Sequence, residues 1–278
     1  MVAGFTPTSI DEALELLLEN ELIPYAGGTD LMIKGDTDAS YLFLHKISEL
    51  KKITQDEQYY YFGAGCTFTE LLENEITPAI LKETVAQIAA PAIRNEATIG
   101  GNIGNGSAKA DSALIFSVTD SILKICGSKG ERLVSINEFY LGNKKIDLMS
   151  DELIVEILMP KKWINDYYYQ KVGARKALAI SRVSFAGLMS IQDGVIEHCA
   201  TAFGAVSDRI IRCSEIDAML IGKTLEEVSE KNESIAIKEQ YLAEIDAAII
   251  PIKGRVSAEY RKSVCMNLVR DFLGGFEI

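Results

Sequence analysis

The spacing of hydrophobic and polar positions in the first half of the chain predicts a mixture of helices and short strands. Ser9-Ile-Asp-Glu12 has the pattern of a capping box, and the leucine-rich run after it predicts a helix that ends near Asn20. Thr67-Phe-Thr-Glu70 repeats this pattern and predicts a second capped helix. Other apolar segments predict strands at 22–26, 41–44 and 59–62 and helices at 79–89 and 112–120.

From residue 121 the pattern changes to one that is typical of strands. Apolar residues on either side of Gly127–Gly130 predict a hairpin with its turn at these glycines. Residues 153–159 predict a strand, which Pro160 ends because proline has no N–H for a sheet. The aromatic run 163–169 is also strand-like.

The last part of the chain predicts a second domain with strands followed by helices. Asp-Gly at 193–194 is a strong hairpin signal, and it lies between apolar runs at 183–191 and 195–206. The rest is expected to be mostly helical, ending in a helix from Ser257 whose apolar stripe packs in the core. The sequence therefore predicts a mixed α/β first half and an α+β domain from about residue 170.

Glycine is concentrated in two segments. Four glycines and two asparagines lie between Gly100 and Gly106, directly after Thr98-Ile99. Because glycine loses much backbone entropy in a regular element, residues 97–111 are expected to form a tight loop rather than an ordinary helix or strand. Residues 25–31 have the same character. Backbone N–H groups in such loops suit an anion, so the pair predicts one extended phosphate-containing cofactor held between two lobes.

Two common nucleotide-binding motifs are excluded. Neither glycine segment is followed by Gly-Lys-Ser/Thr, so neither is a P-loop, and neither has the G-x-G-x-x-G spacing of a Rossmann site. The five cysteines form no C-x-x-C pair, which argues against a zinc site or an iron–sulfur cluster. We expect no metal site and interpret the cysteines as buried small hydrophobic residues.

Composition and charge argue against nucleic acid as a binding partner and against a membrane protein. The 278 residues are 48% hydrophobic and 24% charged, which is ordinary for a globular protein. The formal net charge of −12 makes nucleic acid an improbable partner, because an acidic protein repels a phosphate backbone. The pattern contains no signal peptide and no run of about 20 apolar residues, so we expect no membrane span and a cytoplasmic protein.

The two glycine segments also match a known family when they are taken together. Ala-Gly-Gly-Thr-Asp-Leu at 26–31, Ile-Arg-Asn-x-Ala-Thr-Ile-Gly-Gly-Asn-Ile at 93–103, and Asp111 eight residues later resemble the FAD-binding subunit of molybdenum hydroxylases. This family includes the medium subunit of carbon monoxide dehydrogenase and the flavin subunit or domain of xanthine and nicotinate dehydrogenases. Further similar motifs follow in order, at 151–160, 169–175 and 257–261.

The resemblance implies an α+β fold with a vanillyl-alcohol-oxidase-type (PCMH-type) FAD-binding domain. That domain would cover residues 1–165 and consist of two α/β subdomains, about 1–55 and 56–165. A C-terminal α+β domain of the carbon monoxide dehydrogenase flavoprotein type would cover 170–278. No catalytic protein residue is expected, because catalysis would belong mainly to the cofactor.

The resemblance also implies residues that contact the cofactor. Gly104 and Asn105 would approach the flavin end of FAD. Residues of both glycine segments would contact its diphosphate: Tyr25, Ala26, Gly27, Gly28, Thr29, Asp30, Leu31, Thr98, Gly100, Gly101 and Asn102.

Four residues outside these segments receive cofactor roles from the same resemblance, and each has a structural alternative. Asp111 would hydrogen-bond a polar group of FAD, although it could equally cap the helix that follows. Ile88 and Ile154 would pack on the adenine or the ring system, although such residues are core residues by default. Lys171 would stabilise reduced, anionic flavin, and would otherwise be a solvated surface lysine.

Two observations refine the resemblance. The family often has Ser-Pro-Ala-Gly-Asp before the aspartate, whereas this chain has Ser107-Ala-Lys-Ala-Asp111, which changes the preferred backbone and adds the charge of Lys109. The histidines, His45 and His198, match no flavin-linking motif. We therefore expect noncovalent FAD.

The function implied is that of an electron-transfer subunit. Electrons would arrive from a [2Fe-2S] subunit after a molybdenum-cofactor subunit hydroxylates its substrate, and would leave to an external acceptor such as NAD. Two alternatives remain open from the sequence. One is a free-standing FAD oxidase or reductase of the same fold, and the other is a non-catalytic assembly subunit.

Overall fold

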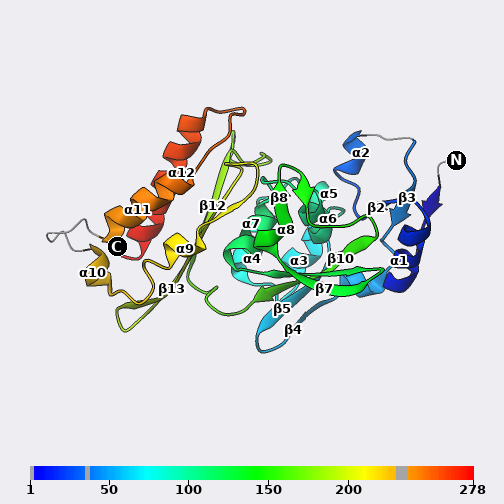
Figure 1. Cartoon of the computed structure of the whole chain (residues 1–278), viewed down its shortest axis with the longest axis horizontal. Helices are drawn as coiled ribbons and strands as arrows, with labels where there is room; N and C mark the ends of the chain where they lie inside the picture. The colour runs from blue at the N-terminus through cyan, green and yellow to red at the C-terminus, as the bar shows by residue number, and fades with distance from the viewer. Residues whose placement is uncertain (1–2, 35–37, 230–236) are drawn as a thin grey trace. The chain divides into compact units, whose positions relative to one another are not determined.

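The computed structural model describes residues 3–34, 38–229 and 237–278, which form two compact units (Figure 1). The first unit contains the chain up to residue 107 together with 120–161. The second contains 108–119 together with 162–278. The second unit thus includes a segment, 108–119, that the domain boundaries expected from the sequence assign to the first domain.

The first unit begins with a small parallel sheet. Its strands lie in the order β1 (Gly4–Phe5), β3 (Tyr41–Phe43) and β2 (Ile23–Tyr25). Helix α1 (Ile10–Glu19) precedes β2, and Ser9 caps it by accepting a hydrogen bond from the Glu12 N–H. The short helix α2 (Leu31–Lys34) follows β2. One face of α1 is buried because its apolar residues share a core with this sheet and with β10: Ala13, Leu17, Leu42, Leu153 and Val155.

The second layer of the first unit is an antiparallel five-stranded sheet. Its order is β4 (Ile53–Gln55), β5 (Tyr59–Gly63), β10 (Glu152–Pro160), β6 (Ile122–Gly127) and β7 (Gly130–Ser135). Strand β10 is central, which explains its long buried apolar run. Short elements complete the unit: η1 (Ser48–Lys51), α3 (Phe68–Glu73), α4 (Ala79–Ala86), α5 (Pro91–Arg94), α6 (Ile99–Gly104), α8 (Ile136–Phe139), β8 (Tyr140–Gly142) and β9 (Lys145–Ile146).

The second unit is a four-stranded antiparallel sheet with helices on both faces. The strand order is β11 (Tyr167–Val172), β12 (Val183–Gln192), β13 (Val195–Gly204) and β14 (Ile211–Arg212). One face packs on α12 (Ala258–Gly275), where the Phe272 ring meets Phe185. The opposite face packs on α7 (Asp111–Val118). The remaining helices are α9 (Ser214–Asp217), α10 (Leu225–Ser229) and α11 (Ile237–Ala248).

Most elements that the hydrophobic pattern predicts are confirmed. Both N-caps form, and at Thr67 the capping box is complete because Thr67 and Glu70 each accept from the other's backbone N–H. The 193–194 turn connects β12 to β13 with positive φ at both Asp193 and Gly194, as a type I′ turn requires. The prediction for 163–169 is partly wrong, because the strand begins only at Tyr167 and Trp163 has φ of 70°.

The prediction that 97–111 contains no regular element is wrong. Residues Ile99–Gly104 form helix α6, capped by the Thr98 hydroxyl, which accepts from the Gly101 N–H at 3.1 Å. Ile99 and Ile103 are both fully buried one turn apart on this helix. Burying each isoleucine contributes about 1.5–3 kcal/mol, which exceeds the cost of roughly 1 kcal/mol for each helical glycine.

The cysteines have the predicted environment with one exception. All five are free, and four are buried, whereas Cys126 is half-buried. Burial raises the pKa of the Cys66, Cys213 and Cys265 thiols to about 12, so these thiols stay protonated and unreactive. Among the described residues, the helices are each too short or too polar to cross a membrane.

Candidate functional site

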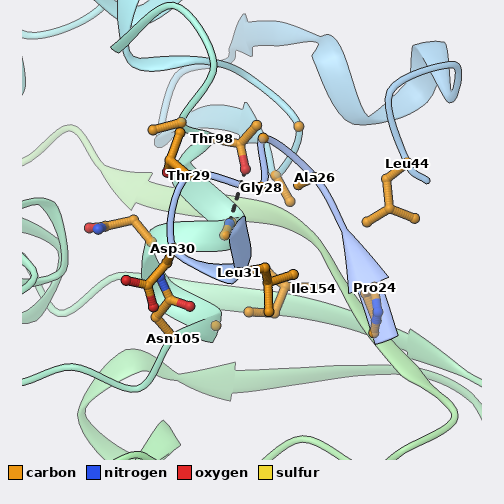
Figure 2. A pocket seen from close by; sticks show the side chains of 18 of the residues that line it. Pro24, Ala26, Gly28, Thr29, Asp30, Leu31, Leu44, Thr98, Asn105 and Ile154 are labelled. Atoms are coloured by element: carbon orange, nitrogen blue, oxygen red, sulfur yellow. Dashed lines mark hydrogen bonds between the residues drawn. The ribbon is translucent and has the colours of Figure 1, made fainter. Parts of the chain in front are cut away.

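A cavity of about 410 Å³ lies in the first unit, where the two glycine segments meet. Its walls come from the end of β2 and the turn after it, from α6, and from the start of β10 (Figure 2). Figure 2 shows the polar side chains of Thr29, Asp30 and Asn105 toward one side and the apolar Pro24 and Leu44 toward the other. The cavity therefore offers both a polar region and an apolar region to one ligand.

The turn after β2 reaches the cavity because its glycines allow close backbone contacts. A Cβ on Gly27 would lie 1.7 Å from the Glu96 carbonyl oxygen, so no other residue fits there. Gly28 has φ of 68°, which favours glycine, and a Cβ on it would lie 1.9 Å from the Tyr25 hydroxyl. The Gly27 contact brings the turn against the chain just before α6, and the Gly28 contact packs the turn on Tyr25.

Helix α6 is fixed at its start by bonds to the segment after β5. The Ile99 N–H donates to the Cys66 carbonyl and the Gly100 N–H to the Ala64 carbonyl, both at 2.9 Å. A Cβ on Gly100 would lie 2.5 Å from the Ala64 Cβ, so this glycine serves packing. The first amides of α6 are thus bound within the protein, and Gly100 faces the cavity without offering its N–H.

Two other glycines of α6 leave space on the cavity side. A Cβ on Gly104 would meet only the Ile154 side chain, at 3.9 Å. A Cβ on Gly101 would meet the Thr98 hydroxyl at 2.9 Å and otherwise only the Ala26 Cβ at 3.9 Å. Gly101 and Gly104 are three residues apart and so share one face of the helix. A side chain at either position would occupy part of the cavity.

The predicted cofactor residues are brought together with four exceptions. Every one of them lines the cavity except Tyr25, Ile88, Asp111 and Lys171. Tyr25 lies directly behind the turn, with its ring against Phe43 at 5.1 Å. Ile88 lies beyond the end of α4, where its carbonyl accepts from the Arg94 guanidinium at 2.9 Å.

Asp111 and Lys171 belong to the second unit and bind each other there. The Lys171 ammonium lies 2.9 Å from the Asp111 carboxylate, and both side chains are more than 90% buried. The other carboxylate oxygen of Asp111 accepts from the Ser181 hydroxyl at 2.7 Å. Lys171 is therefore no solvated surface lysine, and Ser181, which the sequence did not single out, completes the buried cluster.

Other cavity residues were missed by the sequence analysis. They are Ile23, Pro24, Leu44, Leu50, Ala64, Gly65, Ala97, Lys144, Leu148 and Leu153. Apart from Lys144, they are ordinary apolar or small residues of strands and of the loops and turns between elements, which carry no signal of a ligand. Lys144 follows Gly142-Asn143, a turn signal that could have placed it in a loop but not at this cavity.

These residues fit a flavin dinucleotide. An extended cofactor with two ring systems and a diphosphate needs a long cavity with polar and apolar regions, and it needs backbone without side chains where it passes closely. Gly101 and Gly104 form such a wall, since a Cβ on either would intrude on the space. Within the described residues, no group of His, Cys, Asp or Glu could hold a metal ion.

Comparison with known proteins identifies the class. Residues 1–162 match the family described as FAD binding domain in molybdopterin dehydrogenase, and residues 167–275 match the CO dehydrogenase flavoprotein C-terminal domain. The chain belongs to the family of FAD-binding medium subunits of molybdopterin hydroxylases, which includes xanthine, carbon monoxide and nicotinate dehydrogenases. It is an FAD-binding oxidoreductase subunit of a xanthine dehydrogenase-like molybdenum hydroxylase.

Individual relatives agree with this assignment. The chain is 34% identical over 239 residues to a xanthine dehydrogenase FAD-binding subunit of Escherichia coli O157:H7, covering 80% of this chain and 82% of the relative. It is 27% identical to a nicotinate dehydrogenase FAD-subunit of Eubacterium barkeri, covering 80% of each. Reconstituted CO dehydrogenase from Oligotropha carboxidovorans is structurally similar, with a TM-score of 0.87, 25% identity and coverage of 98% and 96%.

Proposed function

We propose that this chain binds one FAD noncovalently in the cavity of its first unit and carries electrons through it. The electrons would come from a [2Fe-2S] subunit that serves a molybdenum-cofactor subunit, and would leave to an external acceptor such as NAD. When bound, FAD supplies the electron-transfer chemistry, because it accepts two electrons and releases them again. The chain's own residues bind, orient and shield it. The first unit would then be a vanillyl-alcohol-oxidase-type domain with two α/β subdomains.

The observation that carries this proposal is the open face of α6. A side chain at Gly101 or Gly104 would fill part of the cavity. At Gly104 the protein itself does not exclude a side chain, because an alanine there would contact only Ile154. Glycine in a helix costs about 1 kcal/mol relative to alanine. Glycine at these helical positions beside a cavity is best explained by a ligand that passes close to the helix backbone.

In this proposal each part of the site has one task. The turn at 26–31 and residues Thr98, Gly100, Gly101 and Asn102 enclose the diphosphate. The Gly100 N–H is already bound to the Ala64 carbonyl, and its missing side chain lets α6 pack on Ala64. Gly104 and Asn105 lie along the flavin end, and Ile154 packs on a ring system. For Tyr25, Ile88, Asp111 and Lys171 the proposed contacts with FAD rest on the family resemblance alone.

The experiment that tests FAD binding is the substitution Gly104→Ala. The added methyl group meets only Ile154 at 3.9 Å, so the variant should fold at least as stably as the parent. We expect the purified variant to lose most of its flavin absorbance near 450 nm, because the methyl group takes up space beside the bound cofactor. Gly101→Val is a poorer choice, since its side chain would also strike the capping Thr98 hydroxyl.

Gly274→Ala is the matched control. Gly274 is a helical glycine of α12 with no atom within 4 Å of an added Cβ, and it lies outside the cavity. It should retain full flavin. Equal flavin content in the Gly104→Ala and Gly274→Ala proteins would contradict the proposed site.

Purification of the native complex tests the proposed partners. Subunits that carry molybdenum and [2Fe-2S] clusters should co-purify with this chain in constant ratio, and metal and flavin analysis would measure that ratio. A flavin-loaded chain that purifies alone from its native source would instead favour a free-standing flavoenzyme. A chain without flavin would favour an assembly subunit.

A further inference from the structure

We propose that Lys144 supplies the positive charge that holds the diphosphate of the cofactor in the cavity. This inference rests on the proposed function, because it assumes that the ligand of the cavity is FAD. It adds a residue that neither the glycine segments nor the family resemblance indicated. Its basis is the charge of the cavity wall and the way the turn that carries Lys144 is attached to α6.

The charge of the cavity wall favours binding of the diphosphate by a cation. Among the described residues that line the cavity, the charged ones are Asp30 and Lys144. The whole chain carries a net charge of −12, so the surrounding potential opposes a ligand with two negative phosphate groups. Asp30 adds to this opposition. Lys144 is therefore the group at the wall that can offset the charge of the diphosphate.

The backbone of Lys144 is fixed beside the end of α6. Lys144 has φ of 56°, an uncommon conformation for a residue with a side chain. Its N–H donates to the Gly106 carbonyl at 3.2 Å, and a Cβ on Gly106 would lie only 3.1 Å from the Lys144 Cα. Close packing of two backbone segments thus holds Lys144 just beyond Gly104 and Asn105. The three residues from Gly104 back to Gly101 span only about 4.5 Å of helix, a distance that the flexible four-carbon stem of a lysine can bridge to reach the diphosphate region.

A second bond attaches the same turn to α6. The hydroxyl of Tyr140, in β8, donates to the Ile103 carbonyl at 3.3 Å. Burial raises the pKa of Tyr140, so its hydroxyl remains protonated and able to donate. Because the turn between β8 and β9 is held at Tyr140 and at Lys144, the lysine keeps its place along the cavity wall.

The Lys144 side chain is available for an anion. It is exposed, and within the described part of the chain its ammonium group makes no ion pair. Lysine binds phosphate as a mobile point charge on a flexible stem, which suits an exposed position next to an extended ligand. Its neighbour Lys145 is also exposed but lies on β9 and does not line the cavity.

The test compares Lys144→Gln with Lys145→Gln in the full chain freed of flavin. FAD and ADP are the probes, since ADP carries the diphosphate without the flavin, and titration calorimetry measures both at about 0.05 and about 0.5 M salt. We expect Lys144→Gln to weaken the binding of both probes about tenfold at low salt and to bind them with a weaker salt dependence. Lys145→Gln should bind both probes as the parent does.

Specific outcomes would overturn the inference. One is that Lys144→Gln binds both probes as tightly as the parent does. Another is that Lys144→Gln and Lys145→Gln lose the same affinity, because that loss would reflect net charge rather than the position of the lysine. A changed reduction potential of bound FAD at unchanged affinity would also overturn it, because the lysine would then face the flavin. If the parent itself binds no FAD, the proposed function fails; if the parent binds FAD and Lys144→Gln binds it equally, this inference alone fails.

Discussion

The carboxylate of Asp217 is the centre of a buried hydrogen-bond network in the second unit. Asp217 is 1% exposed and accepts hydrogen bonds from the Thr201 N–H and hydroxyl, at 2.7 and 2.6 Å, and from the Tyr241 hydroxyl at 2.9 Å. The Arg212 guanidinium lies 2.5 Å from it, and the Arg212 side chain is only 9% exposed. These bonds connect β13, β14, α9 and α11. A buried charge so fully satisfied is stable only while its partners remain.

Asp217→Ala should therefore destabilise the protein by about 3–5 kcal/mol, because Arg212 would be left as a buried charge without its partner. Urea unfolding followed by circular dichroism measures this loss. Asp246→Ala is the control, since Asp246 pairs with Lys262 on the surface, where the side chains are 50% and 35% exposed. It should change stability by less than about 1 kcal/mol. Similar effects of the two substitutions would contradict the role given to Asp217.

At the scale of elements, the sequence predicts capped helices and hairpins well but misreads α6. Ser9, Thr67 and the Asp193-Gly194 turn act through neighbours within four residues, so their local sequence is sufficient. Helix α6 depends on distant contacts. Its amides bond to residues 64 and 66, and its glycines fit against Ala64 and the cavity, none of which the local sequence shows.

The same limit applies to the candidate site. The glycine segments could be recognised because glycine in such density has few structural explanations. Lys144 and Leu44 could not, because each lies beside a short strand in a segment of ordinary sequence and reaches the cavity only through the tertiary fold. Asp111 and Lys171 could be singled out by family resemblance, but their mutual bond depends on the register that places Lys171 opposite Ser184 in the second sheet.

An arginine clamp joins two strands near the cavity wall. Arg132, on β7, donates to both carboxylate oxygens of Glu152 at 2.8 Å and to the Asp147 carboxylate at 2.7 Å. Glu152 also accepts from the Met149 N–H at 2.9 Å. This clamp fixes the segment between β9 and β10, which supplies Leu148 and leads into Ile154 of the cavity. The bonds from Arg132, together with that from Met149, lower the pKa of Glu152 despite its partial burial.

The lowered pKa of Glu152 makes the stability of the fold depend on pH, and the direction of the shift gives the sign of this dependence. Glu152 releases its proton more easily in the folded protein than in the unfolded chain. Its bonds therefore stabilise the fold at pH values above its ordinary pKa of 4.5, and this stabilisation is lost as the pH falls through the pKa of the folded state. Glu152→Gln should therefore lower Tm by about 2–4 °C at pH 7 and by less at a pH below 4.5. Thermal melts of parent and variant at the two pH values measure the difference. Glu73→Gln, at an exposed glutamate of α3, should change Tm little at both pH values.

At the scale of the whole molecule, helix α7 belongs to a different unit from the chain on either side of it. All eight of its residues are buried, and they have no polar face. It packs on β12 and β13, and just before it the Ala108 carbonyl accepts from the Ala205 N–H at 2.6 Å. The sequence could not predict this, because Ser107–Asp111 continues the glycine segment without a break. The apolar residues at 113–116 nevertheless surround the helix, which indicates burial.

Hydrogen exchange of the full chain can test this assignment. Phe272 is fully buried on the face of the second sheet opposite α7, and its ring touches the position where Gly187 lacks a side chain. Phe272→Ala should destabilise the second unit by about 3–5 kcal/mol, so that its segments open more often than those of the first unit. Peptides that cover 111–118 should then exchange faster together with those of β12 and β13, whereas peptides that cover 120–135 should keep their protection. Faster exchange in both sets would mean that the molecule unfolds as one unit. Unchanged exchange at 111–118 would contradict the assignment of α7 to the second unit.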